Sequence, residues 1–288
     1  MTTTTAAATP ITVDAAGVSL SGRAAEPAGP SRGLIVAMHG GTYDSGYYDV
    51  GPDSLLALGP RLDYTVVAVD RPGYGAATDV DDAHKSFAGQ TAVLVAAVDE
   101  LVARYGGPVV LIGHSIGGMM ALRTAGAMST PPAGVEVSGL GELWQPGLRE
   151  MWSSLIGDAP AVSLPAEGHA QVMFGEENTF DAGSVTVDAE LLRPLPMPEL
   201  VDVVAWSEQL PQVGAAISAP VSLTLAEQDR IWQSDDAART ALAGHFTAAA
   251  SVDIDLFTGA GHSIELHRRA RAYALHQLAF AEDCLSRV

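Results

Sequence analysis

The sequence has 288 residues, with 15 Lys and Arg against 34 Asp and Glu, and a formal net charge of −19. This length allows one large or two small domains with a sizeable hydrophobic core. The acidic balance excludes nucleic acid as a main partner, because nucleic-acid binding needs clustered Lys and Arg, and it disfavours anionic membrane surfaces. The single cysteine, Cys284, excludes an intrachain disulfide and a cysteine-rich zinc site.

The N-terminal residues MTTTTAAATP contain neither a basic region nor an apolar stretch, so we expect no secretory signal. Two uncharged stretches, Tyr105–Leu122 and Gln209–Ala226, approach the length of a membrane span. Each contains proline and small residues and is better explained as a strand, a turn and a neighbouring element. The sequence therefore predicts a soluble cytoplasmic protein that has no membrane partner.

The predicted elements alternate along the chain. Residues 1–9 form a Thr/Ala-rich tail that we expect to be disordered, and Thr12–Ala25 predicts an antiparallel pair of strands at one sheet edge. Apolar β-branched runs typical of strands buried on both faces follow at Gly33–Met38, Thr65–Val69, Pro108–Ile112 and Pro220–Leu225, and Pro132–Val137 is a further strand candidate. Val252–Phe257 alternates, as a strand near an edge would. Helical spacing of apolar residues marks Ser54–Leu62, Phe87–Tyr105, Ile116–Met128, Asp235–Phe246 and Ile264–Leu285. This alternation predicts an α/β fold with helices on both faces of a mostly parallel sheet.

Residues 140–209 interrupt the alternation. The segment is rich in Pro, Gly and acidic residues, lacks clear strands, and holds three of the four tryptophans. We interpret it as a cap inserted over the sheet, between a first part of the core at residues 10–139 and a second part at residues 210–288.

The motif Gly113-His114-Ser115-Ile116-Gly117 stands between a predicted strand and a predicted helix. A GxSxG string alone is weak evidence, and a plain glycine-rich turn is the alternative interpretation. At a tight strand-to-helix turn, however, small neighbours allow a serine to stand exposed in a strained conformation, above the positive end of a helix. The motif predicts that Ser115 is a nucleophile.

A serine nucleophile needs a base, and His262 is the candidate. It follows the last predicted strand within Gly259-Ala-Gly-His-Ser263, at the carboxyl end of a strand where catalytic groups gather in open α/β sheets. Five other histidines lie in helical or irregular contexts and are expected at the surface or in packing: His84, His169, His245, His267 and His276. His39 and His114 are expected to order the loops that contain them.

The histidine in turn needs an orienting carboxylate. Asp229 follows the strand PVSLTL and is the candidate, which gives the chain order Ser115, Asp229, His262. Three other carboxylates remain possible at this stage: Glu227, Glu136 and Glu142.

An oxyanion hole requires two backbone N–H groups directed at the developing negative charge. We expect one from Ile116, the residue after the nucleophile. The other is expected from Gly41 in the loop His39-Gly40-Gly41, with Thr42 as the alternative donor, because glycine lets the backbone approach a substrate closely. The same loop could also be no more than a flexible turn.

These motifs, together with Asp70-Arg71-Pro72-Gly73-Tyr74-Gly75, resemble the α/β-hydrolase superfamily over residues 30–285. The resemblance implies an eight-stranded, mostly parallel sheet, a Ser-His-Asp triad and a cap after the sixth strand. It is closest to the cap-bearing esterase, lipase and C–C-hydrolase branches. It implies no cofactor, and no histidine and carboxylate spacing indicates a metal site.

The aromatic residues near these motifs predict a bulky, apolar or aromatic small-molecule substrate. Tyr43 and Tyr47 follow the glycine loop, and Trp144, Trp152 and Trp206 lie in the cap, although part of this set can serve as the core of the cap. We expect hydrolysis of an ester, lactone or thioester through an acyl-enzyme on Ser115. The alternatives are acyl transfer, condensation, cyclisation or C–C cleavage with the same triad, and a non-catalytic ligand-binding scaffold. The oligomeric state is left open.

Overall fold

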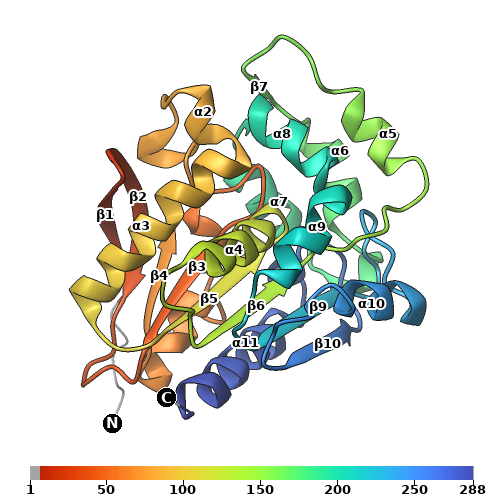
Figure 1. Cartoon of the computed structure of the whole chain (residues 1–288). Coiled ribbons are helices and arrows are strands. Elements are labelled where there is room, and N and C mark those ends of the chain that lie inside the picture. Colours follow the sequence, from red (N-terminus) through yellow and green to blue (C-terminus); the bar gives the residue numbers. More distant parts are fainter. Residues whose placement is uncertain (1–6, 288) are drawn as a thin grey trace.

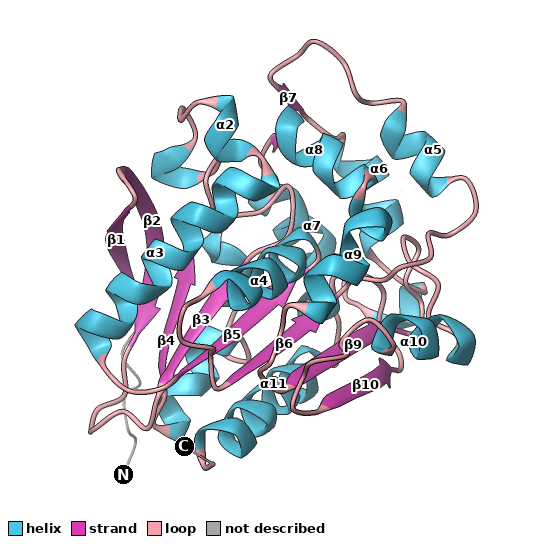
Figure 2. Cartoon of the chain, in the orientation of Figure 1, coloured by secondary structure: helices cyan, strands magenta, loops and turns pink. Residues whose placement is uncertain are grey.

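The computed structural model describes residues 7–287 and is organised around an eight-stranded sheet (Figures 1 and 2). The strand order is β1-β2-β4-β3-β5-β6-β9-β10. Neighbours run parallel except for β1–β2 and β2–β4, which are antiparallel. The strands are β1 (Thr9–Ala15), β2 (Val18–Ala25), β3 (Leu34–Met38), β4 (Thr65–Val69), β5 (Val109–His114), β6 (Gly134–Ser138), β9 (Val221–Ala226) and β10 (Val252–Phe257).

The apolar runs form the centre of the sheet. Every residue of β3, β4, β5, β6 and β9 is buried, because helices cover both faces of these parallel strands. The alternating run Val252–Phe257 becomes β10, which lies at the sheet edge as predicted. The antiparallel pair β1–β2 closes the other edge.

Two helical layers sandwich the sheet (Figure 1). α3 (Phe87–Tyr105) and α4 (Ile116–Ala127) pack on one face, and α1 (Leu55–Leu58) and α11 (Ala270–Leu285) pack on the other. α10 (Asp236–Ala243) packs against β10, and the short α2 (Asp82–Lys85) precedes α3. α3 begins after Ser86, whose side chain accepts a hydrogen bond from the Gly89 amide, and ends at Gly106, where φ is 75°.

The chain between β6 and β9 forms a layer over the carboxyl ends of the strands (Figure 2). It contains α5 (Leu148–Ser153), α6 (Ala166–Met173), α7 (Ala182–Leu191), α8 (Met197–Val204) and α9 (Trp206–Ala215), together with the two-residue strands β7 (Ala161–Val162) and β8 (Leu195–Pro196). The sequence predicted an insertion here but not its helices. They have ten residues or fewer and depend on tertiary packing, so periodicity is a weak signal for them.

The N-terminal part of the predicted tail, residues 1–6, lies outside the described residues. Thr9 does not belong to a tail, because it begins β1 and pairs with Ala24. Among residues 7–287, no helix combines the length and the apolar character needed to cross a membrane.

Candidate active site

Ser115 lies at the sharp turn between β5 and α4, with φ 54° and ψ −124°. A residue other than glycine rarely adopts a positive φ, so the surrounding structure must hold the backbone in this conformation. Close backbone packing does so: a Cβ at position 117 would lie 2.0 Å from the Met38 carbonyl oxygen, and one at position 113 would lie 2.4 Å from the Gly117 oxygen. Only glycine fits at these two positions.

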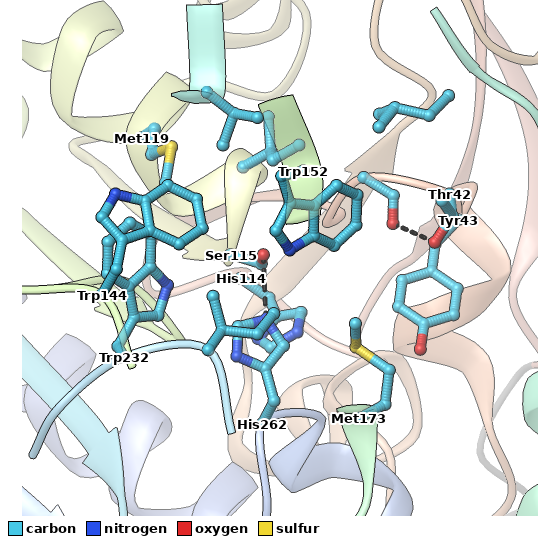
Figure 3. Close-up of a pocket in the computed structure, with 15 residues that line it drawn as sticks. Thr42, Tyr43, His114, Ser115, Met119, Trp144, Trp152, Met173, Trp232 and His262 are labelled. Carbon is cyan, nitrogen blue, oxygen red and sulfur yellow. Dashed lines mark hydrogen bonds between the residues drawn. The ribbon is translucent and has the colours of Figure 1, made fainter. Parts of the chain in front are cut away.

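His262 and Asp229 come together with Ser115 through the folding of the sheet, and Figure 3 shows His262 beside Ser115. The Nε2 atom of His262 lies 3.0 Å from Ser115 Oγ, and its Nδ1 lies 2.9 Å from Asp229 Oδ2. When Nδ1 donates to the carboxylate, Nε2 is left to accept the serine proton. The three side chains therefore form a continuous relay.

The backbone of its own loop orients the Asp229 carboxylate. Oδ1 accepts hydrogen bonds from the amides of Ile231 at 2.7 Å and Trp232 at 3.1 Å, which directs Oδ2 to the histidine. Gln145, at the start of the cap, donates its Nε2 to the Asp229 carbonyl oxygen. This hydrogen bond connects the loop that carries Asp229 to the cap.

The other candidate carboxylates have different partners. Glu227 accepts from the Gly259 amide, and Glu142 pairs with His245 at 3.1 Å. Glu136 is buried, and its partners are the side chains of Thr224, Tyr273 and Gln277. The carboxylate in contact with His262 Nδ1 is that of Asp229.

Two backbone amides near Ser115 are free to donate. Within the described residues, the N–H groups of Gly41 and Ile116 make no hydrogen bond, and Ile116, as the first residue of α4, has no partner inside its helix. The two residues are in contact, since a Cβ at position 41 would lie 2.6 Å from Ile116 Cδ1. The alternative donor, the Thr42 amide, is directed at Tyr74 Oη at 3.3 Å.

A buried group of titratable side chains lies beneath His262. The His114 ring is 5.1 Å from the His262 ring between centroids, and burial followed by the charge of His262 lowers the pKa of His114. Burial raises the pKa of Glu265 to about 7, although a hydrogen bond from Tyr47 at 2.6 Å opposes this shift. Tyr47, predicted to contact substrate, directs its hydroxyl to Glu265.

The relay opens into a small cavity of about 40 Å³ (Figure 3). Its wall contains Tyr43, Trp144 and Trp152 of the predicted substrate-binding set. It does not include Tyr47 or Trp206, and the Trp206 indole instead donates to the Gly141 carbonyl oxygen at 3.1 Å. The remaining wall is Gly41, Thr42, His114, Ser115, Ile116, Met119, Met173, Leu195, Val203, Ile231, Trp232 and His262.

Sequence reasoning missed several of these wall residues. Trp232 packs against Trp144 with ring centroids 4.2 Å apart and ring planes tilted by 40°. It lies three residues after Asp229, so its place in the loop that carries Asp229 could have been noticed. Leu195 and Val203 come from the cap, where no regular pattern indicates which side chains face inward. Among residues 7–287, no group of three His, Cys, Asp or Glu side chains is arranged to hold a metal ion.

The comparisons with known proteins agree with this architecture. The family model described as the alpha/beta hydrolase family matches residues 35–274. The chain therefore belongs to the alpha/beta hydrolase family, which confirms the resemblance and the fold predicted from the motifs. A comparison with curated proteins gives no match.

Several crystal structures share the fold. A carboxyl esterase from Bacillus coagulans is 17% identical, with a TM-score of 0.73 over 98% of this chain and 100% of that chain. A monoglyceride lipase from Saccharomyces cerevisiae is 16% identical, with a TM-score of 0.72 over 99% and 98% of the two chains. An enol-lactonase from Burkholderia xenovorans is 16% identical, with a TM-score of 0.69 over 94% and 100%. At such low identity, these likenesses concern the fold.

Proposed function

We propose that this protein hydrolyses the ester, lactone or thioester bond of an apolar small molecule through an acyl-enzyme on Ser115. The observation that carries the proposal is the Ser115–His262–Asp229 relay, with contacts of 3.0 and 2.9 Å, beside two amides free to donate. The carboxyl esterase, the monoglyceride lipase and the enol-lactonase that share the fold are named for reactions of this type.

In this mechanism, Ser115 Oγ attacks the substrate carbonyl carbon while His262 Nε2 takes the serine proton. Asp229 keeps the proton of Nδ1 in place and stabilises the imidazolium that forms. The Gly41 and Ile116 amides stabilise the negative charge on the carbonyl oxygen. His262 then returns its proton to the leaving group, and a water molecule repeats the sequence on the acyl-enzyme.

The cavity wall supports an apolar substrate, because tryptophan, methionine and aliphatic side chains dominate it. Its volume of about 40 Å³ is much smaller than the roughly 300 Å³ or more of a typical ligand pocket. Binding of a bulky substrate therefore requires this cavity to widen. The net charge of −19 disfavours polyanionic substrates.

A phosphonylating serine-hydrolase probe tests the nucleophile directly by intact-protein mass. We expect one adduct on the wild type and none on Ser115→Ala. Ser222→Ala is a matched control, because Ser222 is a buried serine of β9 that has no contact with His262, and it should be labelled like the wild type. An adduct on Ser115→Ala, or none on the folded wild type, would refute the assignment.

A panel of esters then tests the substrate class. Bulky aromatic or aliphatic esters should exceed short acetyl esters in kcat/KM, and the reverse order would contradict an apolar acyl pocket. Transfer of the acyl group is the second candidate, because the apolar side chains of the cavity wall offer few partners to a hydrolytic water molecule. Product analysis with an added alcohol separates the two: a dominant alcohol ester would favour transfer over hydrolysis.

A further inference from the structure

A buried ion pair joins the cap to the loop that carries Gly41. Arg71 follows β4, and Glu199 lies in the cap helix α8, and both side chains are fully buried. Nη1 of Arg71 donates to Oε2 of Glu199 at 2.6 Å, and Nη2 donates to Oε1 at 3.0 Å. This two-pronged geometry fixes the position of the guanidinium relative to α8.

The same guanidinium fixes the peptide plane between Gly40 and Gly41. The Gly40 carbonyl oxygen lies 3.2 Å from Arg71 Nη2 and 2.8 Å from His39 Nδ1. His39 Nε2 accepts from the Arg71 amide at 3.1 Å, so the proton is on Nδ1, and burial together with the Arg71 charge lowers the pKa of His39 to about 3. In a trans peptide, the carbonyl oxygen and the following N–H point in opposite directions. Two donors on the Gly40 oxygen therefore set the direction of the Gly41 N–H.

The peptide plane between Gly41 and Thr42 is tied to the same carboxylate. The Tyr74 hydroxyl donates to Glu199 Oε1 at 2.7 Å and accepts from the Thr42 amide at 3.3 Å. Thr42 has a φ of 65°, a conformation that needs such support in a residue other than glycine. Both planes that flank Gly41 thus depend on Glu199.

The arrangement depends on the carboxylate that α8 supplies. Glu199 accepts four hydrogen bonds, two from Arg71 and one each from Tyr74 and Gln90. Burial alone would lower the pKa of Arg71, but the Glu199 carboxylate and the Tyr74 hydroxyl together outweigh this and raise it. If α8 moved away, a buried guanidinium would lose its counter-charge, which is strongly unfavourable. The loop around Gly41 would then lose its support.

We propose that Glu199 is a positioning residue through which the cap helix α8 holds the oxyanion hole in its active geometry. Through the Arg71–Glu199 pair and the Tyr74 hydroxyl, α8 holds the two peptide planes that direct the Gly41 N–H. Efficient acylation of Ser115 therefore depends on the contacts that Glu199 makes with Arg71 and Tyr74. This inference deepens the proposed function and rests on it.

The test compares two tyrosines in closely similar settings. Tyr74 and Tyr273 are both buried and both donate a hydroxyl hydrogen bond to a buried glutamate, at 2.7 and 2.8 Å, but Tyr273 contacts Glu136. We expect Tyr74→Phe to lower kcat about tenfold with KM within twofold, since it weakens a donor whose complete loss costs roughly 10²- to 10³-fold. Its affinity for a trifluoromethyl ketone, which forms a tetrahedral adduct with serine, should fall by the same factor as kcat/KM. Tyr273→Phe should change neither quantity by more than twofold.

Glu199→Gln removes the charge while keeping the shape, and we expect a larger fall in kcat than with Tyr74→Phe. If this variant does not fold, the tyrosine pair still decides the question. A Tyr74→Phe enzyme with unchanged kcat, or with a change confined to KM, would overturn the proposal.

Hydrogen–deuterium exchange over residues 39–43 gives a readout that does not need turnover. Exchange should accelerate in Tyr74→Phe and not in Tyr273→Phe, and equal exchange in the two variants would overturn the positioning role. A wild type that hydrolyses no ester and takes no probe would instead refute the proposed function, while the exchange result would still decide whether Glu199 and Tyr74 hold the loop.

Discussion

Substitution of Asp229 by asparagine tests the relay with little change in shape. The Ile231 and Trp232 amides both donate to Oδ1, at 2.7 and 3.1 Å. An asparagine must therefore place its oxygen at this position, because an NH₂ group facing two N–H donors would be left without acceptors. Its NH₂ group then faces His262 Nδ1 in place of Oδ2.

That rotamer of the asparagine reverses the tautomer of His262. Nδ1 must accept from the asparagine, so the ring proton moves to Nε2 and points at Ser115 Oγ, 3.0 Å away. A protonated Nε2 cannot take the serine proton, and the imidazolium also loses its carboxylate. We expect kcat to fall by roughly 10³- to 10⁴-fold, because the wrong tautomer removes base catalysis but leaves the oxyanion donors in place.

The assay is steady-state hydrolysis of a bulky p-nitrophenyl ester. Asp235→Asn is the matched control, since Asp235 caps α10 by accepting from the Ala238 amide and asparagine caps a helix about equally well. An Asp229→Asn enzyme within tenfold of the wild type would show that Asp229 does not orient His262, and the reasoning on the tautomer would be refuted.

Three further predictions concern stability and are measured by chemical denaturation. Burial raises the pKa of Glu136 from 4.5 to about 8. The raised pKa therefore contributes fully to the free energy of unfolding below pH 4.5, and this contribution is lost as the pH rises through 8. Relative to Glu136→Gln, the wild type should lose up to roughly 5 kcal/mol between these limits, and parallel pH profiles would contradict a buried neutral carboxyl. Gly117→Ala should destabilise by about 3 kcal/mol or more, because its Cβ would lie 2.0 Å from the Met38 oxygen and the clash is with backbone; a folded variant of normal stability would refute this. Gly168→Ala in α6 meets nothing within 4 Å and should stabilise by about 0.5–1 kcal/mol; a loss of stability would show that the helix is not held as described.

The core of the fold could be predicted from local patterns. The run Leu34–Met38 is apolar at every position because it is buried on both faces, and α3 carries its buried residues at helical spacing between Ser86 and Gly106. Strand–helix alternation then implies a parallel sheet, in which the carboxyl ends of the strands meet at one edge. For this reason, motifs as distant as those of Ser115, Asp229 and His262 could be expected to lie together.

The cap could not be predicted in the same way. Its helices are short, and periodicity does not indicate which of their side chains face the sheet. Trp206 lies in the cap but donates its indole to a carbonyl oxygen outside the cavity wall, whereas Trp232, outside the predicted set, lines the cavity.

The pair of Arg71 and Glu199 shows the same limit for charged residues. The two residues are 128 positions apart, so a single sequence gives no indication that they pair, although Arg71 lies in a recognisable motif. Residue types and local spacing determine which strands, turns and nucleophile this chain can form. Which buried groups meet across the interface between cap and sheet depends on packing over long range, and the structure alone reveals it.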